Sequence, residues 1–131
     1  MTARPIRRTL LATTATLVLA LCNAAAAAEP SQSKDEISHL LQYVAGSSCT
    51  FIRNGSDYAP DKARDHLASK YEFVGSRITT AEEFIKYLAT QSSMSGEPYH
   101  VRCGKTELLS GAWLTDELNR YRRAPHLQAS R

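Results

Sequence analysis

The sequence contains few cysteines and none of the arrangements in which cysteine usually binds metal or does redox chemistry. Three cysteines occur in 131 residues, without a Cys-x-x-Cys pair or a cluster of Cys and His. His100 and Cys103 are three residues apart on a predicted strand and therefore face opposite sides of it. The signatures of a structural zinc site and of a thioredoxin-like redox motif are thus missing. We expect no metal and no cofactor.

Outside the N-terminal segment, the sequence also has no excess of either positive or negative charge. The sequence has 16 Lys and Arg against 13 Asp and Glu, and three of the arginines lie among the first eight residues. The remaining chain therefore has 13 basic and 13 acidic residues. A neutral chain lacks the basic footprint of a nucleic-acid-binding protein, so we expect no nucleic-acid partner.

A long hydrophobic run is absent, but a short one stands at the N-terminus. Three arginines precede an uncharged stretch, residues 9–28, which ends in five alanines. Its strongly apolar part is about 12 residues long, whereas a membrane-spanning helix needs about 20. We expect residues 1–28 to be a secretory signal peptide that is cleaved, releasing residues 29–131 as a single domain in the periplasm.

Two other interpretations of this segment stay open. An uncleaved membrane anchor is one, although three threonines and an asparagine dilute the apolar run. Lipidation of Cys22 is the other, because the residues before it loosely resemble a lipobox, although Leu21 stands where lipoproteins have Gly, Ala or Ser. If the signal is cleaved, we expect no attachment to the membrane.

Removal of the signal leaves Cys49 and Cys103, which in an oxidising compartment predict one disulfide. The closed ring would contain 55 residues, counted from the two positions. The loop-entropy model gives such a bond about 4 kcal/mol of stabilisation. We expect a structural role for it.

Hydrophobic spacing predicts four short helices. Ser33, Thr80 and Ser110 are the expected capping residues of the first, third and last helix, and Pro60 is expected in the first turn of the second. Ser33 and Thr80 are each followed three residues later by a glutamate, which is the pattern of a capping box. We expect the first helix to end at Gly46, the second near Tyr71 and the last at Pro125, with a frayed tail from about residue 124.

Two segments read as strands. Residues 49–53 are β-branched or aromatic and are followed by Asn-Gly, which predicts a hairpin that sets Phe51 opposite Tyr58. Residues 99–103 alternate as a half-buried strand. The sequence therefore predicts an α+β fold, with four short helices and a small antiparallel sheet made of a hairpin and one further strand.

A further pattern consists of four segments: Cys-Thr-Phe-Ile-Arg-Asn-Gly at 49–55, residues 63–71, Ser-Ser-Met-Ser-Gly at 92–96 with Tyr99, and Trp113-Leu114 with Leu118. Together they resemble a family of small exported proteobacterial proteins, the YfeK-like domain of unknown function. The resemblance implies export and a single domain, and it implies no activity.

The candidate binding site is a polar notch of cations and hydroxyl groups. His66 and Lys70 lie one turn apart on the second helix, and Arg53 lies on the hairpin face expected to meet that helix. With Ser93 and Ser95 they would hold an anion such as a carboxylate or a phosphate. The chain would then be a non-enzymatic accessory domain that binds a periplasmic protein or a small anionic ligand.

A structural interpretation of the same cations remains open. Arg53 and Lys70 would pair with nearby acids and only fix the packing, as surface ion pairs commonly do. The acids within reach in the sequence are Asp57, Asp65 and Glu72. The arginines at 120, 122 and 123 are expected to complement the dipole at a helix C-terminus.

The sequence leaves two further functions open. In a serine hydrolase, Ser93 or Ser95 would be the nucleophile and Lys70 or His66 the base, but no Gly-x-Ser-x-Gly elbow is present. In an inhibitor of a cell-wall hydrolase, the string Ser-Gly-Glu-Pro-Tyr at 95–99 would enter the hydrolase cleft, since it resembles the loop of periplasmic lysozyme inhibitors.

Overall fold

The computed structural model describes residue 2 and residues 29–124, so the predicted signal peptide, Cys22, Pro125 and the predicted tail beyond Ala124 lie outside the described residues. The elements are, in chain order, α1 (Pro30–Gly46), β1 (Thr50–Arg53), β2 (Ser56–Tyr58), α2 (Pro60–Val74), η1 (Gly75–Arg77), α3 (Ala81–Phe84), η2 (Ile85–Ala89), β3 (His100–Cys103), β4 (Thr106–Leu109) and α4 (Ser110–Arg123).

The predicted α+β fold is confirmed, with one strand more than expected. The sheet is antiparallel throughout and has the order β2-β1-β3-β4. The additional strand, β4, was missed because all four of its residues are exposed. An exposed edge strand carries no alternation of apolar and polar residues, which is the signal that identifies a strand in a sequence.

The first hairpin has the predicted register, with Phe51 opposite Tyr58 and Arg53 opposite Ser56. Asn54 and Gly55 both have positive φ, 50° and 75°. A type I′ turn needs positive φ at both central residues, and its twist matches that of the strands. The Asn-Gly pair thus fixes the end of β1, where Arg53 stands.

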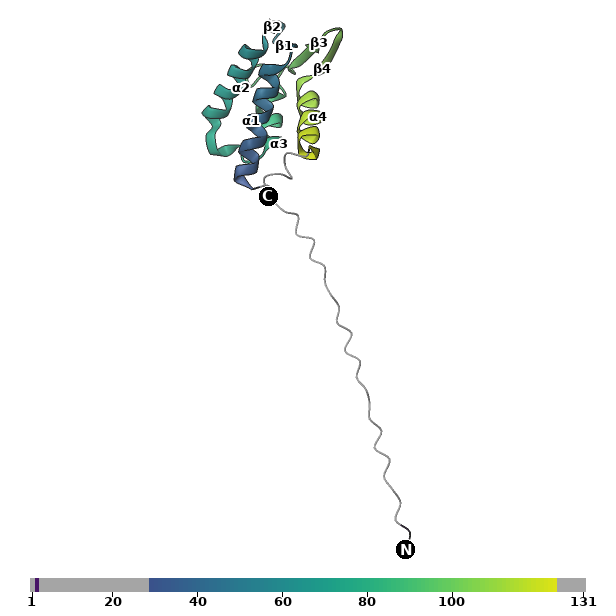
Figure 1. The fold of residues 1–131 in the computed structure, drawn as a ribbon. Coiled ribbons are helices and arrows are strands. Elements are labelled where there is room, and N and C mark those ends of the chain that lie inside the picture. The colour runs from purple at the N-terminus through teal and green to yellow at the C-terminus, as the bar shows by residue number, and fades with distance from the viewer. Residues whose placement is uncertain (1, 3–28, 125–131) are drawn as a thin grey trace.

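The helices lie side by side, with the sheet at one end of them (Figure 1). Helix α1 stands between α2 and α4 in this view, and α3 lies behind it. The core is formed by apolar residues of every helix together with Phe51 and Val101 of the two central strands. Burial of these side chains provides most of the driving force for folding. None of the described helices is long and apolar enough to cross a bilayer.

The predicted disulfide joins Cys49 and Cys103. It links the residue before β1 to the last residue of β3, and these two strands pair directly. Both cysteines pack against the hydrophobic core. The bond therefore secures the centre of the sheet.

One predicted capping box is confirmed in part and the other is wrong. Thr80 accepts a hydrogen bond from the backbone N–H of Glu83 at 3.1 Å, while the Glu83 carboxylate accepts from the backbone N–H of Thr79 at 2.7 Å. Helix α1 instead begins at Pro30, whose fixed φ suits a first helical turn. Ser33 is therefore one turn inside the helix and buried, and its hydroxyl has no hydrogen-bond partner among the described residues.

The last helix also begins differently from the prediction. The capping position is Leu109, and Ser110 is the first helical residue, with no side-chain cap. The backbone N–H of Ser110 donates to the carbonyl of Tyr99 at 2.9 Å. Pairing between β3 and β4 therefore carries the chain directly into α4 and takes the place of a side-chain cap.

Candidate functional site

A cleft of about 310 Å³ opens between the end of β1, one face of α2 and the loop before β3. We call it the cationic cleft. Its lining includes Arg53, Asn54, His66, Lys70, Ser93 and Tyr99. Four of the five predicted site residues thus line one cavity, because the sheet and α2 place them there from distant parts of the chain.

Tyr99 lies at the centre of this group. Its side chain is buried, with 8% of the residue exposed, and its hydroxyl is 3.3 Å from Nε2 of His66. The ammonium group of Lys70 lies 3.4 Å from the same hydroxyl and 5.2 Å from the centre of the tyrosine ring. One phenol therefore joins two groups that are one helical turn apart on α2.

Arg53 also contacts the imidazole of His66. Its Nη1 lies 2.8 Å from each of the two imidazole nitrogens, and its Nη2 donates to the hydroxyl of Tyr58 at 3.1 Å. A guanidinium group can only donate, so the nitrogen that it addresses must be unprotonated. The contact thus requires a neutral imidazole.

Lys70 is held by the backbone of a π-helical segment. Its ammonium group donates to the carbonyl oxygen of Leu88 at 2.8 Å. Leu88 belongs to η2, a π-helix in which Thr90 Oγ1 also donates to the carbonyl of Ile85 at 2.7 Å. Wider turns of this kind often stand at functional sites. Here the turn supplies a neutral acceptor for a cation.

The electrostatics of the cationic cleft disfavour further positive charge. Burial lowers the pKa of His66, and the positive charges of Arg53 and Lys70 lower it further. Burial also lowers the pKa of the Lys70 ammonium, and Arg53 adds to that effect. Burial raises the pKa of the Tyr99 hydroxyl, while Arg53 and a hydrogen bond from Ser92 oppose the rise. The site is thus positively charged and partly desolvated.

Carboxylates do not compensate this charge within the described part of the chain. Neither Arg53 nor Lys70 forms an ion pair there, since every hydrogen-bond partner given above is a neutral group. Two acids considered as partners pair elsewhere: Asp57 with Arg102 at 2.6 Å and Asp65 with Arg64 at 2.7 Å. The cations are therefore free to meet an anion from outside.

The serine loop contributes differently from the prediction. Ser93 is exposed and lines the cationic cleft. Ser95 instead donates a hydrogen bond to Oδ1 of Asn54 at 2.6 Å and so links the serine loop to the hairpin turn. Ser92, which is not among the predicted site residues, is 4% exposed. Its hydroxyl accepts from the backbone N–H groups of residues 94 and 95.

Asn54 and Ser92 were not predicted as site residues, because the role of each depends on a contact between loops that are distant in the sequence. The amide of Asn54 donates to the hydroxyl of Ser92 at 3.5 Å, across 38 residues of chain. The one available signal was the Asn-Gly turn, which identified Asn54 as a turn residue. In a run of similar serines, nothing in the sequence marks the buried one.

The described residues do not show the arrangements expected for the two other functions. Among the described residues, no hydrogen bond joins Ser93 or Ser95 to His66 or Lys70, as a nucleophile and its base would need. An inserted inhibitor loop would have to present Tyr99 to its partner. That tyrosine is buried and faces the cationic cleft instead.

A second set of charged residues lies between α1, α3 and α4. Glu36 is fully buried and receives a two-pronged contact from Arg122, with Nε–Oε1 2.8 Å and Nη2–Oε2 2.9 Å. The same guanidinium contacts Glu82 at 2.5 Å. Hydrogen bonds to Glu36 and Glu82 raise the pKa of Arg122, and the bond to Arg122 lowers the pKa of Glu82. We call these three residues the compensated cluster.

A similar pairing of a buried acid with an arginine lies nearer the start of α4. Glu117, 4% exposed, is 2.6 Å from Nε2 of His39 and accepts from Nε of Arg120 at 2.7 Å. The prediction that Arg120 and Arg122 complement a helix dipole was therefore incomplete, because each one pairs with a buried acid. No group of three metal-binding side chains occurs in residues 29–124.

Comparison with known proteins assigns the chain to a family. A family model described as a family of unknown function (DUF5329) matches residues 31–122, and that span contains the cationic cleft and the compensated cluster. The chain belongs to this family. The resemblance predicted from the sequence is thereby confirmed.

A relative supports the same assignment. The chain is 44% identical over 50 residues to the uncharacterized protein YfeK of Salmonella typhimurium (strain LT2). The match covers 38% of this chain and 42% of that protein, so it spans less than half the length of the relative. No solved structure matches the chain.

Proposed function

We propose that this DUF5329 protein is an exported, non-enzymatic binding domain whose cationic cleft holds an anionic ligand. One observation carries the proposal. Arg53, His66 and Lys70 converge on an open cleft, and no carboxylate of the described residues pairs with either permanent cation.

This arrangement costs free energy. Burial removes part of the hydration of His66 and Lys70, and the charges of Arg53 and Lys70 repel each other and oppose protonation of the imidazole, so the pKa of His66 and that of Lys70 are both lowered. An anion in the cleft would remove that cost. It would also accept charge-assisted hydrogen bonds, which are the stronger kind. Ser93 and Asn54 would supply neutral donors at the rim.

Export into the periplasm is the second part of the proposal. It is supported by the three-part layout of residues 1–28 and by the pairing of Cys49 with Cys103, since disulfides persist in oxidising compartments. Fractionation of cells that express the full chain, followed by mass spectrometry, tests it. We expect a periplasmic product that begins at Glu29 and has no free thiol. A full-length cytosolic product in which Cys49 and Cys103 are both free thiols would contradict export.

The binding proposal is tested by titrating the purified protein with inorganic phosphate and with acetate, followed by NMR. We expect saturable shifts at residues that line the cationic cleft. Lys70→Met keeps the aliphatic stem and removes the charge, so it should weaken binding at least tenfold. It should lower the free energy of unfolding by about 2 kcal/mol, because the hydrogen bonds of the ammonium group to Leu88 and Tyr99 are lost.

The matched control is Lys34→Met, which removes the same charge from an exposed position on α1. It should leave anion affinity unchanged. The proposal fails if neither anion binds, or if the two variants weaken binding equally, because only the net charge would then matter.

A further inference from the structure

An apolar pocket adjoins the cationic cleft. Its volume is about 290 Å³, and Arg53, His66 and Tyr99 line both cavities. The rest of its wall includes Phe51, Ala63 and Leu67. Arg53, one of the two cations of the cleft, therefore forms the partition between a polar chamber and an apolar one together with His66 and Tyr99.

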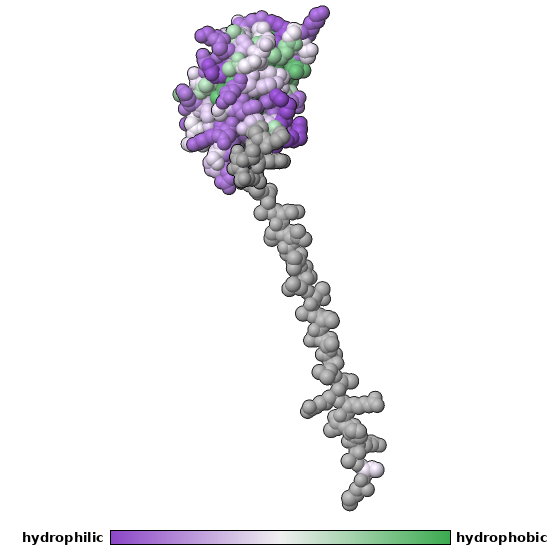
Figure 2. Space-filling view, viewed as in Figure 1, coloured by the Kyte–Doolittle hydropathy of each residue, from purple (hydrophilic) through white to green (hydrophobic). Residues whose placement is uncertain are grey.

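The floor of the apolar pocket is part of the rigid core. Phe51 and Leu67 are 7% and 5% exposed and belong to the main hydrophobic cluster. A pocket bounded by packed core residues keeps its shape when it is empty, because interiors are close-packed and resist collapse. Surface of this kind is uncommon on the face seen in Figure 2, which is mainly hydrophilic and has hydrophobic surface only in small spots.

The two cavities complement one kind of molecule. Ligand pockets commonly have about 300–1,000 Å³, so each cavity alone is at the lower limit and the pair lies within the range. Such pockets are mostly apolar, with a few polar groups that orient the ligand. Here a cation, an imidazole and a phenol, those of Arg53, His66 and Tyr99, stand where the polar and the apolar chamber meet.

We propose that the ligand is a small acid that carries one apolar group. Its carboxylate or phosphate would lie against Arg53, His66 and Lys70, and its alkyl or aryl group would lie against Phe51, Ala63 and Leu67. This inference rests on the proposed function, since it assigns the anion to the same cleft and adds the apolar half of the ligand.

A homologous series of ligands tests the inference without any variant. Acetate, butyrate, hexanoate and 3-phenylpropionate are titrated into the purified protein, with phenyl phosphate as the phosphate member and 3-phenylpropanol as the neutral one. Burial of each added methylene should raise affinity about three- to fourfold until the pocket is full. The alcohol should bind at least tenfold more weakly than the acid of the same size.

A variant that fills the pocket sharpens the test. Ala63→Phe should abolish the gain with chain length and leave the affinity for acetate unchanged. The matched control, Ser69→Phe, places the same ring on an exposed position of α2 that lines neither cavity. It should leave the whole series unchanged. Melting temperatures verify that both variants fold, and acetate binding provides an internal check.

The outcomes separate the two proposals. If acetate and phosphate bind but chain length has no effect, the amphiphilic ligand is wrong and the anion site stands. If the alcohol binds as well as the acid, the charge is not used and the inference is overturned. If no anion binds, the proposed function itself fails. If a chain-length gain persists in Ala63→Phe, the apolar group lies outside this pocket, which also overturns the inference.

Discussion

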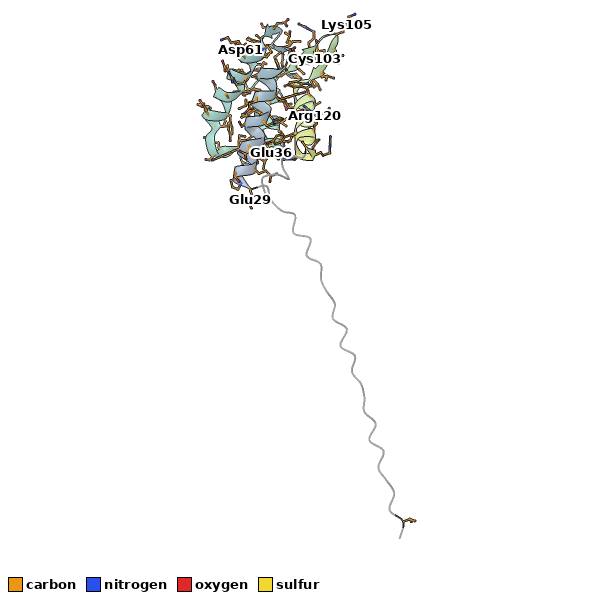
Figure 3. All side chains as sticks on the ribbon, in the orientation of Figure 1. Glu29, Glu36, Asp61, Cys103, Lys105 and Arg120 are labelled. Carbon is orange, nitrogen blue, oxygen red and sulfur yellow. A yellow bond between two sulfur atoms is a disulfide. The ribbon has the colours of Figure 1, made fainter. Side chains whose placement is uncertain are left out.

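The compensated cluster and the cationic cleft are both built from charged side chains, but they differ in what balances them. Arg122 meets two carboxylates, and one of these, Glu36, is fully buried. Arg53 and Lys70 meet only neutral partners within the described chain. In Figure 3, Glu36 lies toward the lower end of the helices, and Cys103 and Lys105 lie at the sheet end.

The difference separates structural charges from charges available for binding. A buried acid that is paired with a guanidinium group through two contacts is neutralised within the fold, so neither charge is available to a ligand. Cations that depress the pKa of a neighbouring histidine have no such partner. A set of titratable groups in a cleft with perturbed pKa values is the usual mark of a functional site. Removing one charge should therefore lower mainly the stability of the fold in the compensated cluster, and mainly the affinity for an anion in the cationic cleft.

The largest expected effect is on stability in the compensated cluster. Arg122→Ala leaves Glu36 buried without a counter-charge and should lower the free energy of unfolding by about 3 kcal/mol. The lower end of the usual range applies because Arg122 is itself 31% exposed. Urea denaturation measures the change. Arg123→Ala, an exposed neighbour, should stay within about 0.5 kcal/mol, and equal losses in both variants would contradict the assignment.

A smaller effect follows from compensating the cationic cleft. Ser93→Asp introduces a carboxylate beside the cations and should weaken the binding of 3-phenylpropionate at least tenfold, about 1.4 kcal/mol. The fold should be no less stable than the original. Ser76→Asp carries the same change of charge on η1, away from the cleft. Affinities from calorimetry that fall alike in both variants would show that the position of the charge is irrelevant.

The smallest effect is a pH dependence of stability. Because the pKa of His66 is lowered in the folded protein, the unfolded chain takes up a proton first as the pH falls below about 6.5. Stability should then decrease as the pH falls from there toward the folded pKa. His66→Gln should remove that part of the slope in urea denaturation between pH 7.5 and 5.5. An unchanged slope would mean that the imidazole is not perturbed.

Much of the fold was predictable because it depends on local chemistry. The Asn-Gly turn set the register of β1 and β2, and hydrophobic spacing identified the helices. Strand β4 was not predictable, because its exposed residues follow no inward pattern. The start of α1 was misassigned because Ser33 offered a capping signal, whereas Pro30 three residues earlier fixes the backbone for helix entry.

The candidate site was predictable only in part. Arg53, His66 and Lys70 follow from the face of α2 and the hairpin opposite it. The roles of Asn54 and Ser92, and the acids opposite Arg122, depend on contacts between segments about 40 to 90 residues apart. Sequence spacing carries no information about such pairs, so these contacts had to come from the structure.

The most direct test is an NMR titration of the His66 imidazole, with and without 3-phenylpropionate. In the free protein its pKa should lie below the ordinary value of about 6.5, because burial and two unbalanced cations oppose protonation. Saturation with the acid should raise that pKa. A free-protein pKa at or above the ordinary value, or one that the ligand does not move, would contradict the account.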